Sequence, residues 1–419
     1  MPGLAERMPT VSNGGRSYSF KLRSGLRYPD GTRVRASDFA HTVRRARSLS
    51  RTARQLFSGI VSVHATDENR AVTVSLRGPD PAFPYVLAST FAGLVPGRTP
   101  LRTGLRRPPA GLGPYELIRT TPDGGYTLRR NVRFQVPGIP TGFIDRITAQ
   151  PFADRGRATR AVITGRLDYL QGTPPIALLP DLRSKYEDRY AEHPSLSTRF
   201  LRLAPRGALK RRRLRHAIAY ATDEKKIGRL SHGLTEPTCN VVPRQLSGYR
   251  LLDPCPWGDP TGSPDLLRAR ALVERLPRPP VLTLSARPRD RVVGRYFART
   301  LKTIGIRARL RLTRGGGRGP LALGAVSPRL PDAAGLLQAS FDHVDRRLAR
   351  RGVEAAREPD QTRRAALAAD LEQRLVRRAV LLPYGNDVRT IFVSERLDLQ
   401  GCARFQPLYG NDYSSFCLK

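Results

Sequence analysis

The chain is poor in acidic residues and lacks long apolar runs. Of its 419 residues, 35 are aspartate or glutamate and 73 are lysine or arginine, which gives a formal net charge of +38. No run of about 18 apolar residues occurs, so we expect no membrane-spanning helix. Residues 1–15 lack a basic stretch followed by an apolar one, so we expect no signal peptide in the chain as given. At about 150 residues per domain, the length predicts two or three domains.

The excess of positive charge suits nucleic acid or an anionic surface as a partner. The arginines, however, are spread over every predicted element, and only short clusters such as 210–216 (KRRRLRH) stand out. No pattern of a DNA- or RNA-binding module accompanies them. We therefore favour solvated basic faces and expect no nucleic-acid partner. A steep salt dependence of DNA affinity would support the alternative.

Cysteine is scarce, and its spacing indicates two pairs. Cys239 and Cys255 bound one segment rich in proline, glycine and asparagine, and Cys402 and Cys417 bound another. Neither pair has C-x-x-C spacing, and no histidine lies between its members, so zinc is not predicted. We predict two loop-closing disulfides, which imply an oxidising compartment. Four unpaired buried thiols are the alternative.

Signatures of catalysis are missing as well. The six histidines show neither H-x-x-x-H nor H-E-x-x-H spacing, and no G-x-S-x-G stretch occurs. The glycine-rich segment 315–320 lacks the Lys-Ser/Thr pair of a phosphate loop, so it predicts a turn. Aspartates in Pro-Asp or Asp-Gly pairs need no role beyond turn formation. We therefore expect no catalytic residue, no metal and no cofactor, which argues against an enzyme.

Apolar periodicity predicts a mixture of strands and helices. Residues 17–23 alternate as a half-buried strand, and a helix follows with Ser37 or Asp38 as its cap. Residues 111–134 predict a hairpin around a Pro-Asp-Gly-Gly turn. Residues 211–233 predict two helices that break at Thr222 and Asp223, where Asp223 caps the second.

Two later segments indicate a second α/β domain. Residues 280–314 predict a strand, a helix ended by Gly305 and a second strand, which together form a β-α-β unit. Residues 358–385 predict a long helix followed by a short apolar strand. We therefore place the start of this domain near residue 205.

Residues 4–46 join many fixed spacings and resemble the family 5 extracellular solute-binding proteins, the peptide/nickel-type receptors of ABC importers. The matching positions are Leu4, Ala5, Glu6, Tyr18, Phe20, Leu22, Arg23, Gly25, Asp30, Gly31, Ala36 and Asp38. The resemblance continues in 111–131, 157–170, 211–227, 296–310 and 381–385. In that family the Leu-Ala-Glu stretch follows a leader peptide and part of the first lobe, so the resemblance implies an N-terminally incomplete lobe.

The resemblance implies a two-lobed, periplasmic-binding-protein-like α/β fold of the class II type, with mixed sheets and a hinge between the lobes. The family-type region is then 1–385. Within it, 1–113 is an extension of the first lobe, 114–200 the first lobe and 205–385 the second lobe. The segment 386–419 returns to the first lobe.

The resemblance also implies a function. The chain would be the substrate-binding component of an ABC importer, a monomer at the periplasmic or extracellular face of the membrane. It would close over a peptide or similar small solute in an interlobe cleft and deliver it to the permease and ATPase complex. The alternative is an intracellular or fused sensory module of the same fold, which paired disulfides would count against.

Four residues are the candidates for ligand contact. Arg329 stands where peptide-binding members carry the aspartate that grips the ligand's amino group, and Asp332 matches a later aspartate of that pattern. An arginine there would repel an ammonium group and favour a carboxylate. A shift of the alignment, or a surface arginine, is the alternative. Tyr249 and Trp257 complete the set, with simple packing as the alternative for Trp257.

Overall fold

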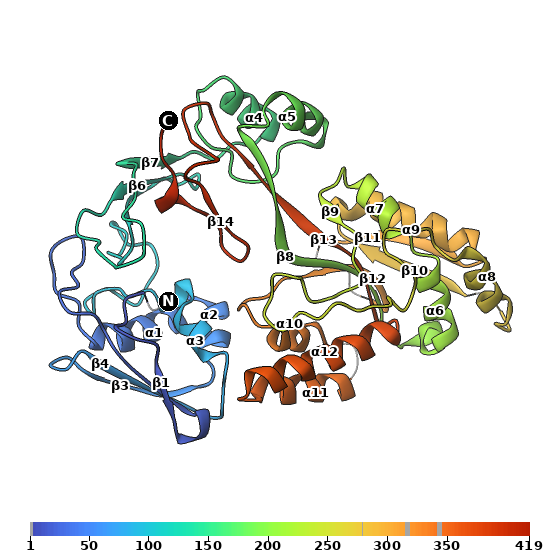
Figure 1. The fold of residues 1–419 in the computed structure, drawn as a ribbon, viewed down its shortest axis with the longest axis horizontal. Coiled ribbons are helices and arrows are strands. Elements are labelled where there is room, and N and C mark those ends of the chain that lie inside the picture. Colours follow the sequence, from blue (N-terminus) through green and yellow to red (C-terminus); the bar gives the residue numbers. More distant parts are fainter. Residues whose placement is uncertain (1–2, 279, 315–318, 342–345) are drawn as a thin grey trace. The chain divides into compact units, whose positions relative to one another are not determined.

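The chain folds as two compact units of mixed α/β structure (Figure 1). The computed structural model describes residues 3–278, 280–314, 319–341 and 346–419. Unit 1 comprises Met1–Ala191 and Ile391–Lys419, and unit 2 comprises Glu192–Thr390, so the chain passes between the units twice. The lobe limits inferred from the sequence stay a prediction. Residues 315–318 of the glycine-rich segment lie outside the described part.

The first half of unit 1 is an antiparallel sheet with helices packed on it. Its strands run in the order β1-β2-β4-β3. They are β1 (Thr10–Ser12), β2 (Ser17–Lys21), β3 (Ile60–Thr66) and β4 (Ala71–Leu76), and the helices are α1 (Ser37–Leu49), α2 (Arg51–Leu56) and α3 (Phe83–Leu87). The ring of Phe39 on α1 packs edge-on against Phe20 of β2, with centroids 5.5 Å apart. The strand predicted over 17–23 is therefore confirmed.

Asp38 has a different role from the predicted helix cap. No side chain caps α1, which follows Ala36. The buried Asp38 carboxylate instead accepts hydrogen bonds from the Gly97 N–H (2.8 Å) and the Tyr28 hydroxyl (2.9 Å). It thus ties the start of the helix to two segments outside it, which local sequence does not reveal.

The second half of unit 1 holds a three-stranded antiparallel sheet in the order β5-β6-β7. Its elements are β5 (Tyr115–Thr120), β6 (Tyr126–Arg130), β7 (Arg146–Ala149), α4 (Arg155–Ile163), α5 (Leu179–Lys185) and the hairpin β14 (Arg404–Gln406) and β15 (Gly410–Asp412). The hairpin predicted over 111–134 is confirmed by the pairing of β5 with β6. The hairpin β14–β15 belongs to the C-terminal segment that completes this unit.

Unit 2 is built on a mixed six-stranded sheet in the order β11-β10-β12-β8-β13-β9. The strands are β8 (Tyr190–Leu203), β9 (Thr235–Glu236), β10 (Val281–Ala286), β11 (Arg307–Leu312), β12 (Leu321–Val326) and β13 (Leu381–Phe392). The helices are α6 (Arg212–Tyr220), α7 (Glu224–Leu230), α8 (Leu266–Glu274), α9 (Arg291–Thr303), α10 (Ala333–Phe341), α11 (Arg346–Arg357) and α12 (Gln361–Arg377). The two passages between units fall inside β8 and β13.

The β-α-β unit predicted over 280–314 is confirmed, because β10 and β11 are parallel and α9 connects them. Gly294 of α9 lies against the sheet, where an added Cβ would come within 2.8 Å of Leu310 Cδ1, so a larger residue there would require the Leu310 side chain to shift. Asp223 caps α7 by accepting from the Lys226 N–H, as predicted. Among the described residues, no helix has both the length and the apolar content needed to cross a bilayer.

Candidate functional site

A cavity of about 680 Å³ lies within unit 1. One wall consists of β7, the residues that follow it and Tyr126 of β6. The others are the first half of α4, the segment 166–171 and parts of the C-terminal segment after residue 395. Its volume is in the range of pockets that hold small organic ligands. Elements from three stretches of sequence therefore meet around it.

Local sequence explains how α4 is placed beside the cavity. Asp154 caps the helix by accepting from the Arg157 N–H (3.0 Å). This hydrogen bond and the one from the Gly156 N–H hold the pKa of Asp154 below its usual range. The helix ends before Gly165, whose φ of +72° turns the chain back. The turn leads into 166–170, which joins the end of β13 through a bridge between Tyr169 and Val393.

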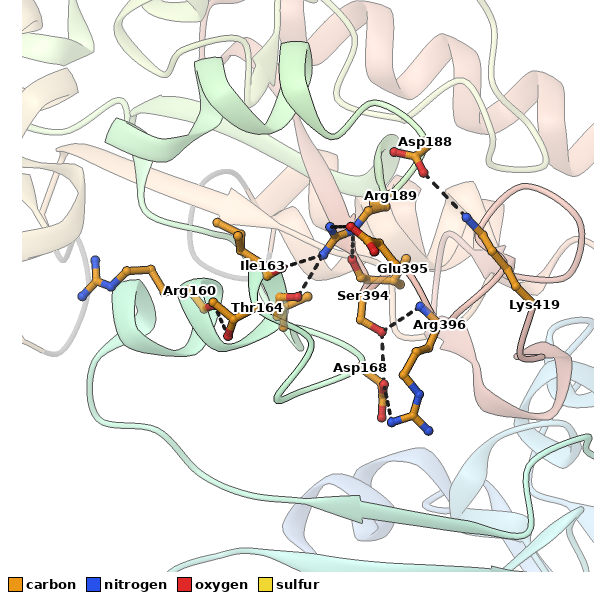
Figure 2. A network of polar contacts seen from close by, with 12 residues as sticks. Arg160, Ile163, Thr164, Asp168, Asp188, Arg189, Ser394, Glu395, Arg396 and Lys419 are labelled. Atoms are coloured by element: carbon orange, nitrogen blue, oxygen red, sulfur yellow. Dashed lines mark hydrogen bonds and ion pairs between the residues drawn. The ribbon is translucent and has the colours of Figure 1, made fainter.

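A buried arginine fastens the end of α4 to the returning strand. Arg189 is 2% exposed and donates to the Val162 carbonyl (2.9 Å) and the Val393 carbonyl (3.0 Å). It also pairs with Glu395 at 3.2 Å. Figure 2 shows its guanidinium between the end of α4 and residues 394–396. Because helix ends leave carbonyls unsatisfied, an arginine here supplies both donors and favourable charge.

The same network orients two charged groups of the cavity wall. The buried Ser394 hydroxyl donates to the Asp168 carboxylate (3.1 Å), and the Ser394 N–H donates to the Asp168 carbonyl (2.8 Å). The Arg396 guanidinium lies 3.6 Å from the same carboxylate (Figure 2). Asp168 and Arg396 both line the cavity, so their positions are set by the buried contacts behind them.

Aromatic rings form the remaining wall. Tyr169 packs edge-on against Tyr413 (6.1 Å between centroids) and Phe416 (5.4 Å). Burial, together with the hydrogen bond to Tyr126, raises the pKa of Tyr413, so its hydroxyl stays protonated near neutral pH. The disulfide between Cys402 and Cys417 closes the C-terminal segment that carries these rings.

The charge of the cavity is strongly one-sided. The charged side chains that line it are Arg146, Arg155, Arg166, Arg396 and Asp168. Planar guanidinium groups bind carboxylates through paired hydrogen bonds, and they stack on flat groups. Four arginines with aromatic neighbours therefore suit an anionic organic solute.

A second, smaller cavity of about 330 Å³ continues along β7. It shares Tyr126 and residues 148–151 with the larger cavity and adds residues of the β5–β6 turn. β7 pairs only with β6 among the described strands, which leaves its other edge without a strand partner, and its residues 146–149 line the larger cavity. A strand edge offers main-chain donors and acceptors to an extended ligand.

The four residues proposed from the sequence all lie in unit 2. Trp257 is buried, donates from its indole nitrogen to the Val376 carbonyl (3.1 Å) and packs against His216 and Tyr220. Burial and neighbouring arginines lower the pKa of His216 to about 4, so this ring is neutral near pH 7. These contacts give Trp257 a packing role, and its ligand contact stays a prediction.

Asp332 is buried, and its side chain caps the start of α10. Its carboxylate accepts from the Gly335 N–H (2.7 Å) and lies 3.4 Å from Arg364. Together with Ser247 and Gly248 it lines a hollow of only about 10 Å³, room for about one water molecule. Arg329 is exposed, and Tyr249 is half-buried with its pKa raised by burial. The structure therefore brings Asp332 near the loop of Tyr249, and ligand binding by these residues stays a prediction.

The contacts of Asp332 lead to a stability prediction. The variant Asp332→Ala is expected to lower the stability of unit 2 by about 2 kcal/mol or more, because it removes a capping side chain and leaves Arg364 without its carboxylate partner. Asp332→Asn should lose less, since an asparagine oxygen also caps a helix. Urea unfolding followed by Trp257 fluorescence measures both variants. An alanine variant as stable as the parent would contradict the capping role.

The cysteines differ from the predicted pattern in one respect. Cys402 and Cys417 are bonded as expected, with their Cα atoms 5.9 Å apart. Cys239 and Cys255, however, are unbonded thiols in the structure, the first buried and the second half-buried. The Cys239 thiol donates instead to the Leu252 carbonyl (3.6 Å).

Sequence reasoning missed the residues of the unit 1 cavity. Asp168 falls within the stretch 157–170 that carried the resemblance, so a signal existed there. Nothing in the sequence distinguishes Arg189 or Arg396 from the many other arginines. Their roles arise from contacts between segments about 200 residues apart in the chain.

Comparison with known proteins gives the family. A model of the bacterial extracellular solute-binding proteins, family 5 Middle, matches residues 1–345. The glutathione-binding protein GsiB of Escherichia coli (strain 536 / UPEC) is 26% identical over 267 residues, which are 62% of this chain and 51% of that protein. GsiB of Shigella flexneri is 25% identical over 265 residues, with the same coverage. The chain thus spans about half the length of the curated relatives it matches.

Solved structures share the fold. The clavulanic acid biosynthesis oligopeptide binding protein 2 is 21% identical with a TM-score of 0.84, covering 100% of this chain and 86% of that one. HbpA2 from Haemophilus parasuis is 19% identical with a TM-score of 0.81, covering 100% and 91%. These likenesses confirm the predicted two-lobed binding-protein fold. The chain belongs to the bacterial extracellular solute-binding proteins of family 5.

Proposed function

We propose that this chain is the substrate-binding component of an ABC importer and that it captures an anionic, peptide-like solute. The observation that carries the proposal is the family match over residues 1–345. The arginines of the unit 1 cavity support an anionic solute. The relatives named as glutathione-binding fit that solute class, and DppA from Helicobacter pylori, which shares the fold, was solved with a bound peptide.

The cavity would act by binding alone. Arg166 and Arg396 offer donors to a carboxylate, Asp168 offers an acceptor, and the aromatic wall covers apolar parts of the solute. Main-chain groups at the outer edge of β7 would hold an extended backbone. The relatives are binding proteins, and we propose no catalytic step. Arg329 and Tyr249 are kept as candidate contacts of unit 2, with the carboxylate preference inferred for Arg329.

The remaining features of the proposal follow from the family. The chain would work outside the cytoplasm as a monomer and pass its solute to a permease and ATPase complex. Two strands, β8 and β13, carry the chain between the units, which suits a hinge that responds to bound solute. The intracellular sensory module would show the same binding without an importer partner.

Titration calorimetry with short peptides tests the proposal. Glutathione and acidic tripeptides are expected to bind, and analogues with amidated carboxyl groups should bind about tenfold or more weakly, because a charge-assisted hydrogen bond is lost. Arg396→Ala and Arg166→Ala should weaken binding similarly. Arg98→Ala is the matched control, since this exposed arginine of unit 1 pairs with Asp30 and does not line the cavity. Equal affinity for acidic and amidated peptides would contradict the anionic preference, and absence of binding to every peptide would contradict the function.

A further inference from the structure

Strand β11 forms one edge of the six-stranded sheet of unit 2. It runs parallel to β10, from the pair of Val281 with Arg307 to the pair of Ala286 with Leu312. Among the described residues, no other strand pairs with it, and no main-chain group of 307–312 bonds to a turn or loop. Since a strand carries N–H and C=O groups on both sides, the outer edge of β11 keeps donors and acceptors available to a further strand.

Three arginines line one face of this strand. Burial alternates along it, so Arg307, Arg309 and Arg311 are exposed and the apolar residues that follow each of them are half-buried. Leu310 faces α9, because a Cβ added to Gly294 of that helix would lie 2.8 Å from Leu310 Cδ1. The three arginines therefore point to the opposite face, about 7 Å apart along the strand. We call them the arginine row.

The face that carries the arginine row is open over most of its length. Of the β10 residues on that face, Val281 and Thr283 are exposed, and only Ser285 at the far end is buried. No carboxylate within the described part of the chain pairs with the arginine row. Between residues 281 and 314 the sequence has one acidic side chain, Asp290, which pairs with Arg199 at 2.9 Å. The positive charge of the row is therefore not neutralised by its surroundings.

The open edge and the arginine row together select a kind of partner. Opposite charges on facing positions of paired strands are stabilising, and like charges are destabilising. A second β11 with its faces aligned would set arginine against arginine, so charge disfavours another copy of this chain. A strand with carboxylates at alternate positions has the spacing of the row. A bilayer surface or a nucleic acid would meet the charges but leave the main-chain edge unused.

We propose that the outer edge of β11 binds an acidic, extended polypeptide segment as an added strand, with its carboxylates facing the arginine row. Main-chain hydrogen bonds along the edge supply affinity, as in other cases of strand addition. The guanidinium groups select the charge and fix the register, because each matches the planar geometry of a carboxylate. This surface belongs to unit 2 and is separate from the solute cavity of unit 1.

The test uses the full chain and a labelled peptide of alternating valine and glutamate residues, with binding followed by fluorescence anisotropy at about 0.15 M salt. We expect the acidic peptide to bind and its valine–lysine counterpart not to bind. An analogue of the acidic peptide with alternate amides N-methylated keeps the charge but loses the donors on one edge. It should bind about tenfold or more weakly. Equal binding of the two acidic peptides would indicate plain charge attraction and overturn strand addition.

A triple variant tests the arginine row. Combining Arg307→Gln, Arg309→Gln and Arg311→Gln should weaken binding of the acidic peptide about tenfold or more, because three facing charge pairs are lost. The matched control replaces by glutamine three exposed arginines of α9, on the other face of the sheet: Arg291, Arg295 and Arg299. Its affinity should stay within about threefold of the parent, since salt screens charges beyond about 8 Å. Equal losses in both triple variants would mean that net charge alone attracts the peptide, which contradicts the proposal.

Hydrogen exchange of the parent chain locates the peptide without any variant. Amides of 307–312 should exchange more slowly when the acidic peptide is bound, and those of β7 should be unchanged. Protection of β7 in place of β11 would assign the peptide to the solute cavity and overturn the proposal. The triple variant of the arginine row should keep the glutathione affinity of the parent, so failure of solute capture and failure of strand addition are distinguishable.

Discussion

Replacing Arg189 with alanine is expected to destabilise unit 1 by about 3–5 kcal/mol, the cost typical of removing one partner from a buried, hydrogen-bonded charge network. The Arg189 guanidinium donates to the carbonyls of Val162 and Val393 and pairs with Glu395. Truncation would remove the donor that binds the Val393 carbonyl and one of the two donors that bind the Val162 carbonyl, which keeps the Gly165 N–H (3.2 Å). It would also remove the cation that faces the carbonyl end of α4.

The side chain of Arg189 contributes packing as well as charge. Its guanidinium carbon lies 5.1 Å from the Tyr186 ring centre and 5.5 Å from that of Phe392. Arg189→Lys keeps the charge but not the planar fork that reaches several acceptors at once. We therefore expect the lysine variant to recover only part of the stability. The wall of the cavity around Asp168 and Arg396 should loosen in both variants, because the network behind it is shared.

The sole tryptophan allows the two units to be followed separately. Trp257 lies in unit 2, so its fluorescence in urea reports that unit, while hydrogen exchange in α4 reports unit 1. Arg189→Ala should accelerate exchange in α4 and in residues 391–398 and leave the Trp257 transition in place. Arg98→Ala, which removes an exposed ion pair, is the control, with an expected change within about 1 kcal/mol. Unchanged exchange in α4 would show that the Arg189 network is not required.

The strands and helices followed from the sequence because their signals are local. Alternation identified the strand at 17–23, and strand, helix and strand in succession identified the parallel pair β10 and β11. Asp223 was recognised as a cap because the atoms it binds lie within the next turn. Asp38 was assigned wrongly because its carboxylate accepts from the Arg35 N–H before the helix and from Tyr28 and Gly97 in other segments, not from the first turn of the helix.

The candidate site was also not predictable from local sequence. In a chain with 73 basic residues, no pattern marks Arg189 as an arginine that becomes buried. Arg189 is buried because Val393 returns beside it, and this contact spans 204 positions of sequence. The cysteine spacing, by contrast, predicted the bridge between Cys402 and Cys417, whereas Cys239 and Cys255 are unbonded in the structure.

Glu372 is expected to make the stability of unit 2 fall as the pH rises from about 4.5 to about 7. The side chain is fully buried, and burial raises the pKa of its carboxyl from 4.5 to about 7, against the amide donors that bind it. In this range the folded chain therefore holds a proton that the unfolded chain has released. Stability then decreases with pH, by about 3 kcal/mol in total for a pKa difference of this size.

The variant Glu372→Gln isolates this contribution. Its amide oxygen still accepts from Val241 and Val242, but the group no longer titrates. Unfolding in urea at pH 5 and pH 8, followed by Trp257 fluorescence, should give a smaller loss for the variant than for the parent. Some loss should persist, because burial also raises the pKa of Glu224 in the same unit.

An exposed carboxylate of the same helix provides the control for this measurement. Asp370 of α12 pairs with Arg374 at 2.7 Å on the solvent side, so Asp370→Asn should keep the slope of the parent. Parallel pH profiles for the parent and Glu372→Gln would mean that the Glu372 carboxyl titrates alike in the folded and unfolded chain. A flatter profile for Glu372→Gln alone would identify a buried, protonated carboxyl as the anchor of the loop 239–257 below pH 7. Above that pH the same anchor carries a buried charge, whose desolvation lowers the stability of unit 2 although the amide donors still bind it.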